Sequence, residues 1–131
     1  MPERRVLVGR AVRRGEAIGE ALVSHEPITF LGGVDPETGM IIESGHELRG
    51  RSIAGKILVF PTGKGSTVGS YTLYRLARAK LAPAGIINAT SEPIVAVGAI
   101  ISDIPMVDEI DIAQIHTGER VQISGERVII G

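Results

Sequence analysis

The hydrophobic and polar positions of the chain change period several times, and each period predicts a different element. Short apolar runs bounded by turn residues predict strands at residues 6–12, 19–24, 56–60 and 84–88. Between the last two strands, apolar residues recur at three- and four-residue spacing over residues 67–81, which predicts a helix. Strand, helix and strand together predict a βαβ unit with a right-handed crossover.

The second half of the chain predicts a helix, a short strand and a hairpin. Residues 93–101 are mostly apolar, and Pro93 at the first helical position favours a helix over a buried strand. Residues 105–107 predict a short strand. Residues 120–123 and 127–130 predict two strands joined by a glycine-containing hairpin turn. Residues 1–131 are therefore expected to form one β-rich α/β domain.

Residues 25–55 interrupt this pattern with a segment rich in Gly, Pro, Asp and Glu, which predicts a long loop. Loops of this length in small domains are often functional. Within the loop, Asp35 follows Gly32 and Gly33. An aspartate in this setting commonly forms an Asx turn, which is the favoured interpretation. The two glycines also permit close approach of a ligand, so Asp35 is a secondary candidate for substrate binding.

Composition and charge exclude several classes of function. The net charge of −1 gives no bulk attraction to nucleic acid or to a membrane surface. The longest apolar run, residues 94–101, is far below the ~20 residues that span a bilayer. No signal peptide is evident at the N-terminus. We therefore expect a cytoplasmic protein with neither a nucleic-acid nor a membrane partner.

The titratable residues predict no metal site. The chain has no cysteine, which excludes disulfides, thiol catalysis and thiolate metal ligation. Its three histidines are far apart in loop-like contexts, where surface or hydrogen-bonding roles are favoured over metal ligation. An acidic stretch that includes Asp103, Asp108, Glu109 and Asp111 lacks any ligand-loop pattern and is expected to be solvated.

The motif with the most chemical content is residues 63–66 (GKGS), which follow the predicted strand 56–60. A glycine turn at this place puts a hydroxyl and free backbone N–H groups near a helix N-terminus, which stabilises an anion or an alkoxide. A Walker nucleotide loop is excluded, because it needs glycine at position 58 and Ser or Thr at position 65. Local chemistry alone favours Ser66 as a helix N-cap. A catalytic role would need a strong outside charge, since no base lies beside Ser66 in the sequence.

Several motifs in the same order resemble the small subunit of the aconitase X family. The motifs span nearly the whole chain and are residues 32–39 (GGVDPETG), 63–66 (GKGS), 69–70 (GS), 93–100 (PIVAVGAI) and 104–107 (IPMV). The resemblance implies a compact swivelling domain with a β/β/α barrel-like fold, of the aconitase swivel type. It also implies a heterodimer with a large subunit whose cysteines hold a [4Fe-4S] cluster.

The reaction that the resemblance implies is the removal of water from (R)-5-phosphomevalonate, which gives trans-anhydromevalonate 5-phosphate in an archaeal route to isoprenoids. The motif places Ser66 as the proton-abstracting base. The substrate-binding candidates are Gly63, Lys64, Gly65, Thr67 and Asp35. Ordinary aconitases have Ser-Arg-Glu after the base, whereas this chain has Thr67, Val68 and Gly69, which is consistent with a different substrate.

Two alternatives remain open at this stage. The first is the small subunit of another hydroxy-acid dehydratase, such as one that acts on hydroxyproline. The second is a non-catalytic module that binds an anion and uses Ser66 only as a cap.

Overall fold

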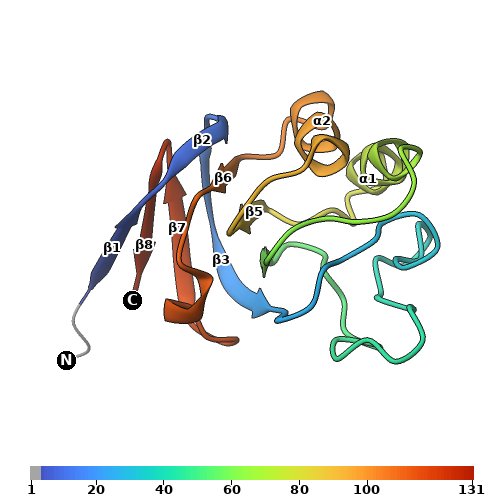
Figure 1. The fold of residues 1–131 in the computed structure, drawn as a ribbon, viewed down its shortest axis with the longest axis horizontal. Helices are drawn as coiled ribbons and strands as arrows, with labels where there is room; N and C mark the ends of the chain where they lie inside the picture. Colours follow the sequence, from blue (N-terminus) through green and yellow to red (C-terminus); the bar gives the residue numbers. More distant parts are fainter. Residues whose placement is uncertain (1–3) are drawn as a thin grey trace.

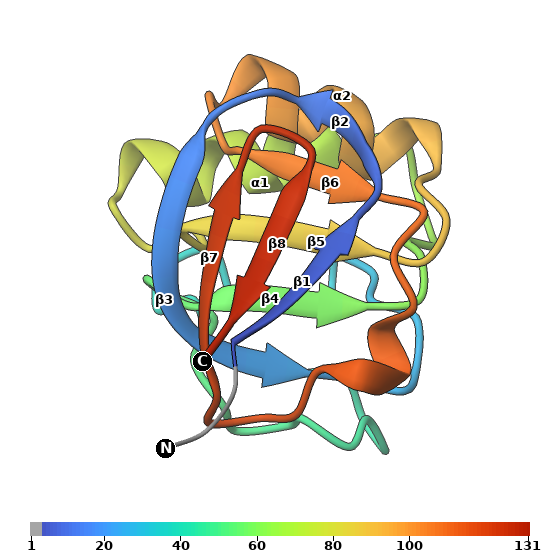
Figure 2. The same cartoon turned by 90° about the vertical axis from the view of Figure 1, so that its left-hand side faces the viewer.

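Eight strands form a nearly closed sheet that packs against two helices in the computed structural model, which describes residues 4–131 (Figures 1 and 2). In chain order the elements are β1 (Arg5–Val8), β2 (Arg10–Arg13), β3 (Glu16–Val23), β4 (Ile57–Phe60), α1 (Gly69–Arg78), β5 (Gly85–Asn88), α2 (Pro93–Ile101), β6 (Met106–Asp108), the 3₁₀ helix η1 (Ile112–Gln114), β7 (Arg120–Ser124) and β8 (Arg127–Ile130). The strand order is β1-β8-β7-β3-β4-β5-β6-β2.

Strand β3 joins the two halves of the sheet. Residues 16–20 pair antiparallel with β7, and residues 21–23 pair parallel with β4. Strands β3, β4, β5 and β6 are mutually parallel, whereas β1, β8 and β7 form an antiparallel ribbon. Figure 1 shows the result as three layers, with the antiparallel ribbon on the left, the parallel strands in the middle and the helices on the right. This β/β/α arrangement confirms the predicted swivel-type fold.

The parallel strands are buried on both faces because each face meets a different core. On β4, Leu58 and Phe60 pack toward the helices, whereas Ile57 and Val59 pack toward the antiparallel ribbon. All four residues of β4 are fully buried, as expected for a parallel strand covered on both sides.

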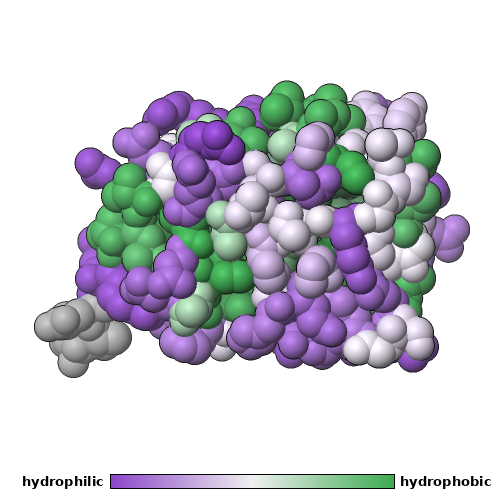
Figure 3. All heavy atoms as spheres, viewed as in Figure 1, coloured by the Kyte–Doolittle hydropathy of each residue, from purple (hydrophilic) through white to green (hydrophobic). Residues whose placement is uncertain are grey.

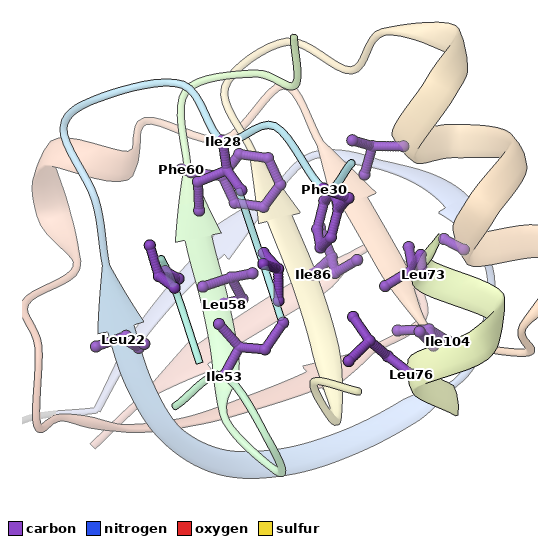
Figure 4. Close-up of a cluster of buried hydrophobic side chains, with 14 of the residues drawn as sticks. Leu22, Ile28, Phe30, Ile53, Leu58, Phe60, Leu73, Leu76, Ile86 and Ile104 are labelled. Carbon is purple, nitrogen blue, oxygen red and sulfur yellow. The ribbon is translucent and has the colours of Figure 1, made fainter. Parts of the chain in front are cut away.

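The long loop 25–55 closes the helix-side core rather than lying loosely on the surface. Ile28, Phe30 and Ile53 are among its buried residues and lie beside Leu58 and Phe60 (Figure 4). The rings of Phe30 and Phe60 meet edge to face, with centroids 6.3 Å apart. Apart from isolated bridges, the segment has no regular strand, which confirms the loop prediction.

The prediction of one strand over residues 6–12 is wrong, because Gly9 divides that segment between two partners. Strand β1 pairs with β8, and β2 pairs with β6. A Cβ at position 9 would lie 2.2 Å from the Asp108 carbonyl oxygen. Only glycine therefore allows the chain to bend so closely past β6, and alternation of apolar residues gives no sign of this change of partner.

Helix α1 is shorter than the predicted range 67–81 at both ends. It begins at Gly69 and ends at Arg78, since Lys80 adopts a left-handed backbone with φ of 62°. The Leu81 N–H donates to the Leu76 carbonyl over 2.8 Å, and the Lys80 N–H donates to the Ala77 carbonyl over 3.1 Å. These two bonds form a Schellman motif, which here uses lysine instead of the usual glycine.

The predicted helix at Pro93–Ile101 is confirmed, as is the hairpin of β7 and β8. The expectation that the acidic stretch is solvated is wrong for Asp108, whose side chain is 1% exposed at the end of β6. The Arg10 guanidinium donates to both carboxylate oxygens of Asp108 over 3.0 and 2.6 Å, and the Ser91 hydroxyl donates over 2.6 Å. Asp108 thereby ties β2, β6 and the segment before α2 together.

The pKa of Asp108 reflects this setting. Burial raises the pKa, but the hydrogen bonds from Arg10 and Ser91, together with the guanidinium charge, outweigh burial. The pKa of Asp108 therefore lies below its ordinary value of 3.8. A lowered folded-state pKa stabilises the fold above the unfolded-state pKa, and this stabilisation is lost as the pH falls through the folded-state value.

We predict that Asp108→Asn lowers the free energy of unfolding at pH 7 by about 1–3 kcal/mol, because charge-assisted bonds to a buried group are lost. The difference between wild type and variant should shrink as the pH falls below about 4, because the carboxylate takes up its proton there in the unfolded chain and only at lower pH in the folded protein. Chemical denaturation at pH 7 and at pH 3 measures both values. An equal difference at the two pH values would contradict the ionic role.

Candidate functional site

The candidate site lies at the carboxyl edge of the parallel strands, on residues 61–68, which join β4 to α1. Ligands of α/β sheets bind at this edge, where the strands end and backbone groups are free. Ser66 is exposed there, and its neighbours Lys64, Gly65 and Thr67 are exposed as well. Gly63 is buried, so the segment leaves the core at Gly63 and reaches the surface within one residue.

Ser66 lies just before helix α1 and is not its N-cap. The N-cap is Val68, which provides no side-chain hydrogen bond. The prediction that Ser66 is the N-cap is therefore wrong, because the cap lies two residues later. Instead, Ser66 opens a turn in which the Gly69 N–H donates to the Ser66 carbonyl over 2.9 Å. In the same turn the Val68 N–H donates to Ser66 Oγ over 3.2 Å.

This geometry gives the Ser66 hydroxyl a backbone donor beside a helix N-terminus. The partial positive charge of that terminus favours an oxygen that carries negative charge. The donor and the hydroxyl belong to one short turn, so their relation depends little on other parts of the chain. The site can therefore stabilise developing charge on Ser66 Oγ.

Gly63 and Gly65 are required by close contacts on opposite sides of the loop. A Cβ at position 63 would lie 2.4 Å from Glu92 Oε1 and 2.5 Å from Val95 Cγ2, at the start of α2. A Cβ at position 65 would lie 2.2 Å from Thr29 Oγ1. Gly65 also has φ of 98°, a backbone conformation that side chains rarely adopt. The loop is thus held between α2 and the long loop 25–55.

Lys64 ties the site to the long loop by backbone and side chain. Its N–H donates to the Ile28 carbonyl over 3.1 Å, beside a parallel bridge between Ile28 and Gly63. Its ammonium pairs with Glu43, with Nζ to Oε2 at 3.1 Å. The charge of Lys64 is thus already partnered within the chain, and an anion would compete with Glu43 for it.

Thr67 lies on the other side of Ser66, at an apolar hollow between the two helices. The hollow has a volume of about 280 Å³ and is lined by Thr67, Ser70, Pro93, Ile94 and Val97. The Ser70 hydroxyl donates to the Ile94 carbonyl over 2.6 Å and so fixes the two helices beside each other. Green, apolar atoms gather over α2 at the top of Figure 3, and Val97 is 48% exposed.

Asp35 belongs to a separate turn. Asp35 Oδ1 accepts a hydrogen bond from the Glu37 N–H over 2.9 Å, and the Gly39 N–H donates to the Asp35 carbonyl over 2.8 Å. This is the Asx-type turn favoured by the sequence. The structure thus brings together Gly63, Lys64, Gly65, Ser66 and Thr67, whereas the hydrogen bonds of Asp35 within residues 4–131 stay in its own loop.

Sequence reasoning missed Thr29 and underrated Glu92 as neighbours of the site. Glu92 accepts hydrogen bonds from the Ile94 and Val95 N–H groups over 2.9 and 2.7 Å, so it caps α2 while packing on Gly63. Its place before Pro93 signalled a helix start but not this contact. Thr29 belongs to no sequence motif. Its place beside the site is evident only from the structure, in which it packs against Gly33 and Gly65.

The residues of this chain do not fit an iron–sulfur cluster. The chain has no cysteine, and within residues 4–131 no three His, Asp or Glu side chains gather as a metal site. In the same described part, no helix has the length and apolar content to cross a bilayer.

Comparison with known proteins places this geometry in a family. The family model described as "Aconitase X swivel domain" matches residues 6–131. The phosphomevalonate dehydratase small subunit of Thermococcus kodakarensis is 55% identical, over 92% of this chain and 90% of that protein. The same-named protein of Methanosarcina mazei is 61% identical, over 79% of this chain and 72% of that protein.

A solved structure agrees in fold. A crystal structure of Thermococcus kodakaraensis aconitase X, in its holo form, has a TM-score of 0.95 and 53% sequence identity, and the match covers 97% of this chain and 98% of that one. The chain belongs to the aconitase X swivel-domain family. Its relatives named phosphomevalonate dehydratase small subunit are archaeal proteins, so the sequence-based resemblance is confirmed at this level.

We predict that Gly65→Ala is more destabilising than Gly118→Ala, although the two glycines have φ of 98° and 95°. Each variant incurs about 1–2 kcal/mol for a side chain in the left-handed region. Gly65→Ala adds about 1–3 kcal/mol of overpacking against Thr29, whereas a Cβ at position 118 meets nothing within 4 Å.

Equilibrium denaturation of both variants measures the difference. Equal losses of unfolding free energy would show that the loop shifts freely away from Thr29.

Proposed function

We propose that this chain is the small subunit of a two-subunit iron–sulfur hydro-lyase that dehydrates (R)-5-phosphomevalonate to trans-anhydromevalonate 5-phosphate. The proposal is supported by the match to relatives named phosphomevalonate dehydratase small subunit, at about 55% identity over most of the chain. The observation that carries the assignment of the base is the exposed Ser66 hydroxyl, which accepts from the Val68 N–H over 3.2 Å at the carboxyl edge of the sheet.

Ser66 removes the proton from C2 of the substrate while water leaves from C3. A serine hydroxyl is a weak base, so its alkoxide form has to be stabilised. The Val68 N–H and the N-terminus of α1 supply part of that stabilisation, because they are aimed at the oxygen before the reaction begins. Gly63 and Gly65 let the loop pack closely against Glu92, Val95 and Thr29, which holds Ser66 in place. Thr67 lies next to Ser66 and borders the substrate. Lys64 leaves its partner Glu43 and pairs with an anionic group of the substrate.

The [4Fe-4S] cluster belongs to the large subunit in this proposal, since this chain's residues do not fit it. That subunit must then lie against the face that carries Ser66. The apolar hollow beside Thr67 lies on this face, and Val97, one of its lining residues, is 48% exposed. Val68, which follows Thr67 in the chain, is 54% exposed. We assign this surface to contact with the large subunit, because burial of exposed apolar side chains stabilises association.

We predict that Ser66→Ala lowers turnover of the reconstituted complex at least ~10²–10⁴-fold, the usual contribution of a general base. Association of the subunits should be unchanged, because only a surface hydroxyl is lost. The measurement is a steady-state dehydration assay under anaerobic conditions, with binding checked by gel filtration. Near-normal turnover would remove Ser66 from the base role.

Ser52→Ala is the matched control. Ser52 is also exposed, and its Oγ accepts from the Ala54 N–H over 3.2 Å, as Ser66 Oγ does from Val68. Turnover of this control should stay within about twofold of wild type, because Ser52 shares the exposed ST-type turn but does not lie before a helix N-terminus. Activity that does not depend on the 5-phosphate, or that acts on hydroxyproline instead, would contradict the proposed substrate.

We also predict that the isolated chain has no dehydratase activity and that activity appears when the large subunit is added.

A further prediction concerns the surface assigned to the large subunit: Val97→Asp should weaken the recovery of activity on addition of that subunit. A charge placed in the apolar hollow should raise the dissociation constant at least tenfold, because it would be buried without a partner. Val8→Asp is the control, since Val8 is 63% exposed on β1 in the layer away from α2 (Figure 1). Turnover by the isolated chain, or equal effects of the two variants, would contradict the assigned surface.

A further inference from the structure

Thr29 occupies the space that two separate glycine motifs leave open. Its Oγ1 lies 2.2 Å from the position that a Cβ of residue 65 would take. Its Cγ2 lies 2.7 Å from the corresponding position at residue 33, and its carbonyl oxygen lies 2.2 Å from that position. Thr29 therefore packs between Gly33 and Gly65, with its hydroxyl on one side and its methyl group on the other.

The backbone of Thr29 is anchored by its neighbours. Ile28 and Phe30 are each 2% exposed, and both point into the helix-side core (Figure 4). The Ile28 carbonyl accepts from the Lys64 N–H over 3.1 Å, and the Ile28 N–H donates to the Thr62 carbonyl over 3.3 Å. With both flanking residues buried and the segment paired to residues 62–64, Thr29 has little freedom to move away from Gly65.

The hydroxyl of Thr29 is also oriented. It donates to the Leu31 carbonyl over 3.3 Å, which directs Oγ1 along its own loop and against Gly65. The chain turns at Gly65, with φ of 98°, and the next residue is Ser66. A change of one backbone angle at Gly65 would swing the Ser66 hydroxyl, because that hydroxyl lies one residue beyond the turn.

We propose that Thr29 is a positioning residue for Ser66, whose hydroxyl sets the Gly65 turn and thereby aims Ser66 Oγ. The inference rests on the proposed role of Ser66 as base. Thr29 acts through the loop and is not assigned a contact with substrate. Since misplacement of a reacting group by about 1 Å costs on the order of 10²-fold in rate, loss of this contact should affect the chemical step more than substrate binding.

The test compares Thr29→Ala, Thr29→Ser and Thr38→Ala in the reconstituted complex. Thr29→Ala should lower kcat about 10- to 100-fold with KM within about twofold. Thr29→Ser keeps the hydroxyl and should recover most of the lost kcat. Thr38→Ala, in a separate turn of the same loop where Thr38 Oγ1 accepts from the Met40 N–H over 3.2 Å, should leave kcat unchanged. Thermal melting and gel filtration confirm that each variant is folded and assembled.

A double-mutant cycle with Ser66→Ala separates positioning from a general structural effect. If Thr29 acts through Ser66, Thr29→Ala causes no further loss in the Ser66→Ala background. Equal losses in both backgrounds, or a Thr29→Ala complex with wild-type kcat beside an impaired Ser66→Ala complex, would overturn the inference alone. Near-normal turnover of Ser66→Ala would instead overturn the proposed base and, with it, the role of Thr29.

Discussion

Two-sided burial of the parallel strands is the constraint on which the rest of the structure depends. Every residue of β4 and β5 is buried, and the apolar side chains of each strand alternate between the helix-side core and the core against the antiparallel ribbon. Neither strand can slip by one residue, because a slip would exchange the two sets of side chains. The position at which each strand ends, and hence where the site begins, is therefore set by packing on both faces.

The position of the loop after β4 is also fixed, because the loop makes close contacts of its own. Gly63 is pressed against Glu92 and Val95, and Gly65 against Thr29. These neighbours belong to α2 and to the long loop, both of which contribute buried residues to the same core. The exposed Ser66 is thus supported by rigid packing on either side, although it lies on a loop. Such support is what a site requires when it must hold a reactive group in one orientation.

The sequence predicted those features that depend on local pattern. Apolar runs located the buried strands, and Pro93 and Gly125 correctly marked a helix start and a hairpin turn. The failures have a common origin in contacts between distant segments. The break at Gly9 follows from a backbone approach to Asp108, and the burial of Asp108 follows from pairing with Arg10, 98 residues away. Local alternation carries no information about either.

The same limit applies to the candidate site. Gly63, Lys64, Gly65 and Ser66 form a recognisable motif, so they could be selected from sequence. The prediction that Ser66 caps the helix was wrong because a turn over residues 66–69 precedes α1, and the helical periodicity did not reveal this turn. Thr29 lacks any motif, and the role proposed for it depends on which atoms fill the space left by Gly33 and Gly65. Such a residue becomes visible only when the loops are placed beside each other.

The surroundings of Ser66 also bear on how chemistry is divided between subunits. Within residues 4–131, the Ser66 hydroxyl has the Val68 N–H as its hydrogen-bond partner, and no histidine or carboxylate bonds to it. One backbone donor and a helix terminus contribute on the order of 1–3 kcal/mol to an anion, whereas each pKa unit requires about 1.4 kcal/mol. The pKa of an ordinary serine hydroxyl lies many such units above neutral pH. For the proposed base role of Ser66, the remaining stabilisation has to come from charge outside this chain or from increased acidity of the substrate proton. The proposed site would therefore be chemically complete only in a complex.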